Sequence, residues 1–359
     1  MKKISILLPY KENFSSDYAG AVSLLINDTT KLSKYKKNIK IYGFTTFTKN
    51  LLPNNYINLL LKKTFFQSLT NIYLKKFSIH EKLNPSNIIE IHNRPNYVNK
   101  IHSINKNIIL YFHNDPLSQK GSVSKKDRIS LLINTKKIIF ISNWVKNRFF
   151  FGIEKYKKKK SNYEIIPHSI NKIKIDLKKK KKFIIFVGRL NKSKGYDIFG
   201  ETIIKILNKH KNWKAFVYGD EPREKIVFKH KNLKILGFKK HKQILEKFKQ
   251  SSISVICSRW EEPFGRTALE ASSRGCAVII SNRGGLNEAA SFGLKINKLN
   301  STNLFNKINM LILDNQYRLN VQKKTLISFK YSDDYVSKKI DEYRNKLIME
   351  FTQEVLGAN

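Results

Sequence analysis

Short, continuous apolar runs recur along this chain and alternate with segments of helical or loop character. Strands that are buried on both faces and joined by crossover helices have this pattern, which is typical of parallel β-sheets. A first series of runs covers residues 4–8, 39–44, 88–91, 108–112, 137–141 and 163–166, and a second covers 183–187, 215–218, 234–236, 253–256 and 277–280. We therefore predict an α/β chain with two doubly wound, Rossmann-like domains.

The segment between the two series, residues 166–182, ends in five consecutive lysines and is predicted to be a solvated linker. A length of 359 residues suits two domains of ordinary size. We place the first domain at residues 1–172 and the second at 173–343. Ser332 can cap a helix whose apolar residues recur at helical spacing. The end of that helix, about residues 344–359, is predicted to return to the first domain.

The basic residues outnumber the acidic ones by 69 to 27, which gives a formal net charge of +42. A chain of this charge can bind nucleic acid or an anionic membrane. Only 11 of the basic residues are Arg, whereas guanine is read mainly by the planar fork of Arg, so the excess of Lys argues against base recognition. An A+T-rich coding sequence would also enrich Lys without selection for binding.

Cys257 and Cys276 each lie in an apolar run and are predicted to be reduced core thiols. The apolar stretch at residues 4–8 is too short for a signal peptide, and no run of 18 apolar residues could span a membrane. We therefore expect a cytoplasmic protein.

Polar side chains follow nearly every predicted strand, at the edge where open parallel sheets bind their ligands. In the first half, Asn93 and Arg94 come after the run 88–91, and His113 comes directly after the run 108–112. In the second half, Gly188 and Arg189 follow the run 183–187. We expect these residues to line binding sites.

The strongest cluster lies between residues 258 and 289, where a strand, a polar loop and a helix beginning near Gly265 are predicted. The start of this helix leaves the backbone N–H groups of Phe264, Gly265, Arg266 and Thr267 available to an anion. Glu262 precedes the helix and Glu270 lies within it, eight positions further on. This spacing indicates that the two carboxylates hold different parts of one extended ligand, where each can accept hydrogen bonds from sugar hydroxyls.

A second cluster joins Arg189 to Lys194, which precedes Gly195 and a helix with Phe199, Ile203, Ile206 and Leu207 on one side. Two cations on a loop that leads into a helix N-terminus suit a diphosphate, because Arg binds it bidentately and Lys acts as a point charge.

The motifs GRL-x3-KG at 188–195, Glu-x7-Glu within EEPFGRTALEASSRGCAVI, and GGLNE at 284–288 resemble those of retaining family 4 glycosyltransferases of the GT-B architecture. The match is most specific over residues 183–288 and is coherent through IIEIHNRPNYV and LYFHNDP in the first half. The resemblance covers most of the chain. It implies transfer of a hexose-type sugar, with retention of the anomeric configuration, from a nucleotide-diphosphate sugar to a glycan or lipid-linked acceptor.

The resemblance also implies a role for each matching residue. Arg189 and Lys194 would grip the diphosphate, Glu270 would bind the ribose, and Glu262 with the backbone at Phe264 and Gly265 would hold the donor sugar. From the first domain, His113 would face the donor sugar and Gly20 would lie near the phosphates. Asn93 and Arg94 would face the acceptor. Ala19 stands where the family usually has a second glycine, and Asn171 stands where its Pro-Asn-Gly-Val-Asp type segment has an acid.

No Asp-x-Asp pair stands near a strand end, and no His/Cys set has the spacing of metal ligands, so we predict transfer without a metal or other cofactor. Similar proteins build lipopolysaccharide, capsule and other surface glycans, which implies peripheral contact with the inner face of an anionic membrane. The alternatives are a non-catalytic GT-B protein that binds nucleotide sugars and a basic protein that binds nucleic acid. The retained Arg189, Lys194, Glu262 and Glu270 argue against the first, and the absence of an aromatic-basic motif argues against the second.

Overall fold

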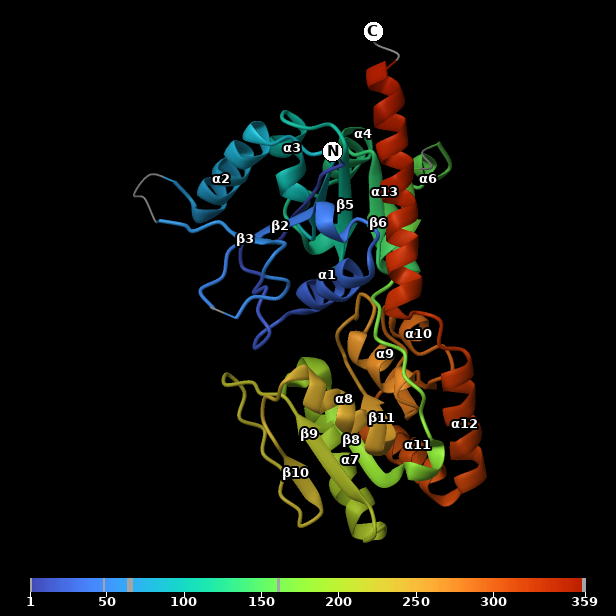
Figure 1. Cartoon of the computed structure of the whole chain (residues 1–359). Helices are drawn as coiled ribbons and strands as arrows, with labels where there is room; N and C mark the ends of the chain where they lie inside the picture. Colours follow the sequence, from blue (N-terminus) through green and yellow to red (C-terminus); the bar gives the residue numbers. More distant parts are fainter. Residues whose placement is uncertain (1, 48, 63–66, 160–161, 357–359) are drawn as a thin grey trace. The chain divides into compact units, whose positions relative to one another are not determined.

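The computed structural model describes residues 2–47, 49–62, 67–159 and 162–356. The chain forms two compact units (Figure 1). The first contains Met1–Asn171 together with Tyr331–Asn359, and the second contains Lys172–Lys330. The chain thus returns to the first unit before the predicted residue 344. The reason is that Ile170 forms a bridge with Ser332, so the whole of the last helix, α13 (Asp333–Leu356), joins this unit.

The first unit is built on a parallel sheet of seven strands in the order β3-β2-β1-β4-β5-β6-β7. The strands are β1 (Ile4–Leu7), β2 (Ile39–Gly43), β3 (Tyr56–Asn58), β4 (Ile88–His92), β5 (Ile108–Phe112), β6 (Lys137–Phe140) and β7 (Tyr163–Ile165). Its helices are α1 (Ala21–Leu32), α2 (Leu69–Leu83), α3 (Val98–His102), α4 (Lys125–Asn134), α5 (Asn143–Phe150), α6 (Lys155–Lys159) and α13. The central strands β1, β4 and β5 are fully buried, as their mainly apolar sequences predict, although β1 also buries Ser5 and β4 buries Glu90 and His92.

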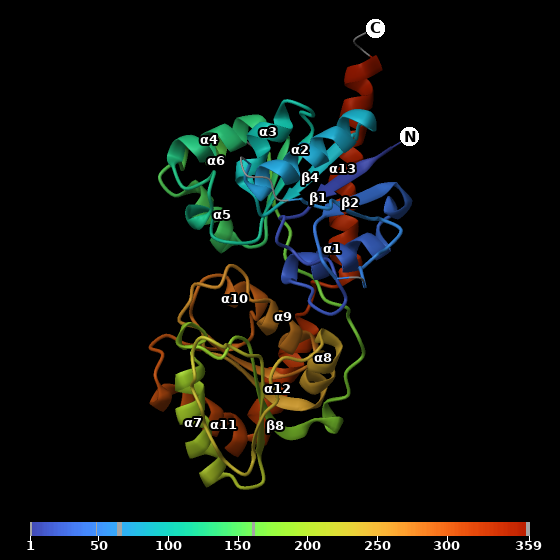
Figure 2. The same cartoon turned by 90° about the vertical axis from the view of Figure 1, so that its left-hand side faces the viewer.

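The helix α13 packs on α1 and reaches strand β4, and Figure 2 shows it running beside the sheet. Its predicted apolar side comprises Val336, Ile340, Tyr343 and Leu347. Three of these are buried in the core of the first unit, and Tyr343 is partly buried against it. The side chain of Val336 is fully enclosed. The last helix therefore belongs to the hydrophobic core of this unit.

The second unit has a parallel sheet of six strands in the order β10-β9-β8-β11-β12-β13. The strands are β8 (Lys181–Val187), β9 (Lys214–Tyr218), β10 (Leu233–Ile235), β11 (Ser251–Ile256), β12 (Ala277–Ser281) and β13 (Leu294–Ile296). Its helices are α7 (Tyr196–Lys209), α8 (His241–Gln250), α9 (Arg266–Ser273), α10 (Leu286–Ala289), α11 (Ser301–Leu313) and α12 (Asn315–Ile327). The residues predicted on one side of α7, from Phe199 to Leu207, are all enclosed in the core, and α7 packs against α11 (Figure 2).

Both units are doubly wound α/β units with parallel sheets, as predicted. The sequence runs did not reveal β3 and β13, which contain three residues each and lie at sheet edges. Five short 3-10 turns connect the elements: η1 (Lys36–Asn38), η2 (Pro95–Tyr97), η3 (Pro116–Ser118), η4 (Leu177–Lys179) and η5 (Lys192–Lys194).

The prediction that the five-lysine run is solvated throughout is wrong for Lys180. Its ammonium group donates to the carbonyl oxygens of Phe248, Ser251 and Arg274, at distances of 2.9, 2.7 and 2.6 Å. Burial lowers the pKa of Lys180 below its ordinary value. Three carbonyl oxygens replace the water that a lysine normally needs, so this residue ties the start of β8 to the core of the second unit. Cys257 and Cys276 are both free and buried, which confirms the prediction of core thiols.

Candidate functional site

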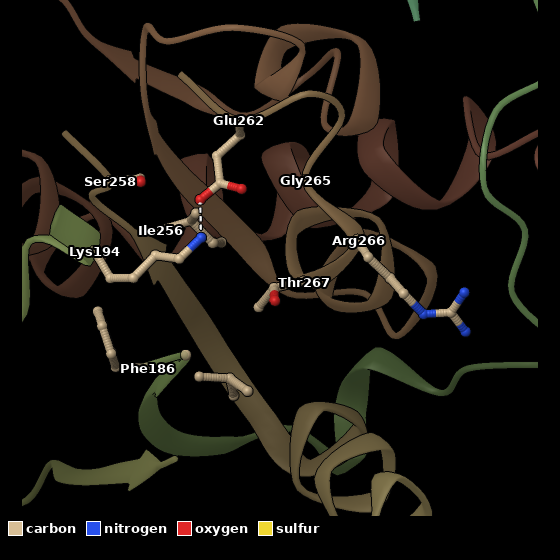
Figure 3. A pocket seen from close by; sticks show the side chains of 10 residues that line it. Phe186, Lys194, Ile256, Ser258, Glu262, Gly265, Arg266 and Thr267 are labelled. Carbon is tan, nitrogen blue, oxygen red and sulfur yellow. Dashed lines mark hydrogen bonds and ion pairs between the residues drawn. The ribbon is translucent and has the colours of Figure 1, made fainter. Parts of the chain in front are cut away.

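A pocket opens at the carboxyl ends of β8 and β11 in the second unit (Figure 3). It is open to solvent, and its empty space of about 390 Å³ includes part of that solvent. The residues that line it are Phe186, Val187, Gly188, Lys194, Ile256, Ser258, Glu262, Gly265, Arg266 and Thr267. Six of the residues predicted to bind the donor therefore line one pocket: Gly188, Lys194, Glu262, Gly265, Arg266 and Thr267.

Lys194 and Glu262 point toward each other in this pocket and form an ion pair (Figure 3). Their side chains are 24% and 13% exposed, so both still meet solvent. Lys194 ends the turn η5, which packs so closely on β11 that a Cβ atom on Gly195 would lie 1.9 Å from the Cys257 carbonyl oxygen. Gly195 also has φ 71°, a left-handed conformation that glycine adopts without strain. The glycine of the KG motif thus sets the position of Lys194.

The GGLNE segment supports the loop that carries Glu262. A Cβ atom on Gly284 would lie 2.1 Å from the Glu262 carbonyl oxygen, and Gly285 N donates to that same oxygen at 2.6 Å. The neighbouring carboxylate of Glu261 accepts hydrogen bonds from Gly284 N at 2.6 Å and from the Arg283 guanidinium at 2.9 Å. Two glycines are needed because two stretches of backbone lie in direct contact.

Helix α9 begins at the pocket and is preceded by Gly265, which has φ 97°. The guanidinium of Arg266 extends away from the Lys194–Glu262 pair (Figure 3), and its Nε donates to Glu270 Oε1 at 2.9 Å. His241 Nε2, at the start of α8, lies 2.7 Å from the same oxygen. Glu270 is 5% exposed, and burial alone would raise its pKa. The hydrogen bonds and charges of His241 and Arg266 outweigh burial and lower the pKa of Glu270, so the carboxylate is ionised at neutral pH.

Three other donor residues predicted in the second unit lie outside the lining of the pocket. Arg189 follows Gly188 just after β8 and is exposed, whereas Glu270 is buried on α9. Phe264 is 1% exposed and packs into the unit, so only its backbone is suited to contact a ligand.

In the first unit, His113 follows β5 and is 5% exposed. Its Nε2 lies 3.0 Å from Nδ1 of His92, the last residue of the neighbouring strand β4. The ring of His168 is 5.3 Å from that of His113, centroid to centroid. Burial, with the nearby His92 and His168, holds the pKa of His113 well below its ordinary value, so the imidazole is neutral at pH 7.

The sequence interpretation assigned no role to His92, His168 or His241. His92 directly follows the apolar run 88–91, the same signal that identified His113. His168 lies just beyond a predicted strand in a segment to which no role was given. His241 has no local signal, because its partner Glu270 lies 29 positions further along the chain.

Asn93 and Arg94 form the turn after β4. Asn93 has φ 56° and is 7% exposed, and its Oδ1 accepts from His113 N at 3.2 Å and from Gln119 Nε2 at 2.9 Å. The Arg94 guanidinium donates to the Asn93 carbonyl oxygen at 2.7 Å. Asn93 therefore connects the ends of β4 and β5.

Gly20 is the residue before α1, as predicted, and lies close to a carboxylate. A Cβ atom there would lie 2.5 Å from Glu12 Oε1, which accepts hydrogen bonds from the backbone N and the hydroxyl of Ser23 at 3.1 and 2.8 Å. Gly20 makes room for the acid at the start of this helix.

Within the described residues, no group of three or more His, Cys, Asp or Glu side chains could hold a metal ion. In the same part of the chain, no helix is both long and apolar enough to cross a membrane.

Comparison with protein families gives a match over residues 169–326, a range that contains every residue lining the pocket. The matching family is described as glycosyl transferases group 1. After this match we call residues 169–326 the group 1 domain. The group 1 domain therefore contains the Lys194–Glu262 pair, the start of α9 and the GGLNE segment.

Curated relatives match different lengths of the chain. Spore coat protein SA of Bacillus subtilis is 33% identical over 129 residues, which cover 32% of this chain and 33% of that protein. The putative glycosyltransferase YtcC of the same organism is 24% identical over 80% of this chain and 77% of its own length. The lipopolysaccharide core biosynthesis mannosyltransferase LpsB of Rhizobium meliloti is 29% identical over 32% of this chain and 35% of its own length. The chain thus spans about a third of the length of two of these relatives.

Among solved structures, HepE of Anabaena, crystallised with UDP-glucose, superposes with a TM-score of 0.70 at 17% identity. The superposition covers 96% of this chain and 99% of HepE. The two units have the Rossmann-like α/β folds of the GT-B class, as predicted.

Proposed function

We propose that this protein is a retaining glycosyltransferase that moves a hexose from a nucleotide-diphosphate sugar to a glycan or lipid-linked acceptor. The observation that carries the proposal is the pocket of the group 1 domain, which holds an ammonium group, a carboxylate and the start of a helix together. This set matches the three chemical parts of a nucleotide sugar, which are an anionic diphosphate, hydroxyl-bearing sugars and a leaving group that gains charge.

Breaking the bond between the sugar and the diphosphate leaves negative charge on the phosphate oxygens. Lys194 supplies a positive charge from one wall of the pocket, and the free N–H groups at the start of α9 supply a partial positive charge from another. Arg189 is exposed at the end of β8, beside the pocket residue Gly188, and is free to turn toward the same phosphates. These fixed groups support a reaction that uses no metal ion and no other cofactor.

The pairing of Lys194 with Glu262 orders both side chains for the donor. In our proposal a diphosphate shares the Lys194 ammonium group, while the carboxylate of Glu262 accepts hydrogen bonds from hydroxyl groups of the sugar. Removing either the ammonium group or the carboxylate would leave an uncompensated charge in the pocket.

Glu270 is proposed to bind the ribose of the nucleotide. Both hydrogen bonds that it accepts in the described part of the chain go to Oε1, from Arg266 and His241. Its second oxygen, Oε2, can therefore accept a ribose hydroxyl while Oε1 keeps the side chain in place. HepE was crystallised with UDP-glucose, which supports a nucleotide-sugar donor in a protein of this fold.

The acceptor is proposed to be a precursor of lipopolysaccharide or another surface polysaccharide, a proposal supported by the name of the relative LpsB. Such acceptors are carried on the inner face of an anionic membrane, and each lysine near that surface would contribute about 1 kcal/mol to a peripheral contact. The formal net charge of +42 suits this contact, and we propose a cytoplasmic protein that binds the membrane without spanning it.

A screen of UDP-, GDP- and ADP-hexoses tests the proposal directly. Release of the nucleoside diphosphate should occur with one donor, and the same nucleotide should raise the unfolding temperature, because a ligand that binds only the folded state stabilises it. Proton NMR of the product should show the same anomeric configuration as the donor. An inverted anomer would contradict the retaining reaction. Failure of every nucleotide to bind would contradict the function altogether.

A further inference from the structure

A row of four buried polar side chains leads from the last helix of the first unit to His113. The Arg344 guanidinium on α13 binds the Glu90 carboxylate on β4 through two hydrogen bonds of 2.7 and 2.8 Å. Oε2 of Glu90 lies 3.9 Å from Nε2 of His92, and Nδ1 of His92 lies 3.0 Å from Nε2 of His113. The exposed fractions of these four side chains are between 1% and 5%. The positions of their protons are therefore set by neighbouring protein groups and not by solvent.

The proton positions follow from the charge at one end of this row. Burial would raise the pKa of Glu90, but the charge and hydrogen bonds of Arg344 outweigh it and lower the pKa to about 2, so Glu90 is ionised. Burial lowers the pKa of His92, which is therefore neutral and carries one N–H. Nε2 of His92 makes no hydrogen bond within the described residues, but the anionic Glu90 oxygen lies 3.9 Å from it. This negative charge favours the proton on Nε2 and the lone pair on Nδ1.

The next residue must complement this arrangement. Since Nδ1 of His92 is an acceptor, Nε2 of His113 must donate across the 3.0 Å contact. A neutral imidazole has only one N–H, so Nδ1 of His113 then carries a lone pair. Nδ1 of His113 is buried and has no hydrogen-bond partner among the described residues. A buried acceptor without a partner is costly unless a ligand supplies the donor.

We propose that Glu90 and His92 are positioning residues that hold His113 in its Nε2–H tautomer, so that Nδ1 accepts a hydrogen bond from a hydroxyl group of a sugar ligand. The ligand role of His113 rests on the proposed function, whereas the tautomer belongs to the protein alone. Tyr111 stacks on His92 with 4.2 Å between centroids and 8° between planes, and Asn93 holds the His113 backbone, so both imidazole rings have supported orientations.

The tautomer can be measured in the unmodified full chain by NMR of protein labelled with ¹⁵N-histidine. The His113 signals would be assigned by their loss in His113→Gln. The expected result is a pyridine-like shift for Nδ1 of His113 and a pyrrole-like shift for Nε2. A pyrrole-like Nδ1 would overturn the proposal. No substrate is needed, so the tautomer can be confirmed even if the protein transfers no sugar, and that outcome would contradict the proposed function instead.

His92→Phe tests the consequence for catalysis, because phenylalanine retains a ring against Tyr111 but removes both nitrogens. The Nδ1 shift of His113 should move toward the average of the two tautomers. The kcat of transfer should fall about tenfold or more, the equivalent of one hydrogen bond, while the KM for the nucleotide sugar changes little. His80→Phe on the exposed face of α2 is the matched control and should leave both readouts unchanged. An unchanged tautomer together with unchanged kcat in His92→Phe would refute the role of His92.

Glu90→Gln separates the charge from the shape of the side chain. Without the anion, the preference for Nε2–H on His92 should weaken, and the Nδ1 shift of His113 should move toward the pyrrole-like position. A His113 shift identical to that of the unmodified protein would show that Glu90 does not set the tautomer. If this variant does not fold, the measurement on the unmodified chain and that on His92→Phe still decide the proposal.

Discussion

Replacing Arg344 by Met should destabilise the first unit by about 3–5 kcal/mol, the usual cost of breaking a buried ion pair by removing one partner. Arg344 is 2% exposed and is bound by two carboxylates, through hydrogen bonds to Glu90 at 2.7 and 2.8 Å and to Asp341 at 3.1 Å. The variant leaves the 1% exposed Glu90 without its counter-charge. The expected loss is a large part of the 5–15 kcal/mol that typically separates folded from unfolded protein.

Urea unfolding followed by fluorescence would measure this loss. Of the three Trp residues, Trp144 lies in the first unit, so a background with Trp213→Phe and Trp260→Phe would report on that unit alone. Lys338→Met is the matched control, because its ion pair with Asp334 on the same helix is 72% and 65% exposed. The unfolding free energy of this control should lie within about 0.5 kcal/mol of that of the unmodified protein.

The pH dependence gives a second, independent check. In the folded protein the pKa of Glu90 is about 2, below its ordinary value of 4.5, so its stabilising effect is complete above the ordinary value and is lost as the pH falls toward 2. In Arg344→Met, burial without a counter-charge raises the pKa of Glu90 above the ordinary value, so the penalty is largest at neutral pH and fades on acidification. The difference in unfolding free energy between the unmodified protein and Arg344→Met should therefore become smaller from pH 7 to pH 4.

Replacing both partners separates an unpaired charge from lost packing. Glu90→Met with Arg344→Met removes both charges and should recover much of the stability lost in Arg344→Met. The reasoning would be refuted if Arg344→Met lost no more stability than Lys338→Met, or if the difference from the unmodified protein did not narrow as the pH falls.

Three further predictions concern the pocket. Lys194→Ala should lower the rate of transfer about 100-fold or more, because it removes a fixed positive charge that stabilises the leaving diphosphate. The control Lys205→Ala, on the exposed side of α7, should leave the rate unchanged. Equal steady-state rates for the two variants would contradict a role of Lys194 in the mechanism. Glu270→Ala should raise the Kd of the nucleoside diphosphate, measured by calorimetry, about tenfold. The control Glu246→Ala, on the exposed side of α8, should leave the Kd unchanged. An unaltered Kd in Glu270→Ala would contradict ribose binding by Glu270. Transfer should continue in excess EDTA, and activity that disappears with EDTA and returns with a divalent cation would show a metal requirement.

The long central strands could be predicted from the sequence because both their faces are buried, which leaves continuous apolar runs such as 108–112 and 253–256. Edge strands of three residues give a weak signal: β7 and β10 were predicted, whereas β3 and β13 of the same length were missed. The surroundings of Lys180 could not be predicted for a different reason. The carbonyl groups that bind it come from residues 68, 71 and 94 positions away, and only the folded chain brings them together.

The candidate site shows the same distinction between local and distant information. Motifs in one stretch of chain placed Lys194, Gly265 and Glu262 around one ligand, and the structure places all three in the lining of one pocket. The contact between His92 and His113 depends on the register of β4 against β5, in which His92 lies opposite Tyr111. A sequence alone does not reveal that register. The sequence could therefore identify His113 as a candidate site residue, but not its contact with His92.

Net charge is a poor guide to function in this chain, whereas the few acids are informative. Because the chain has 69 basic residues, a lysine or arginine on the surface is by itself no sign of a binding site. Only 27 residues are acidic. Burying an acid is costly unless specific donors surround it, so each buried acid marks a place where the fold provides them. Within the described residues the buried acids are Glu81, Glu90, Glu221, Glu270 and Asp341. Two of the five belong to proposed functional groups: Glu270 is the proposed ribose ligand and Glu90 is part of the row that leads to His113. This argues that function constrains the scarce charge more strongly than the abundant one.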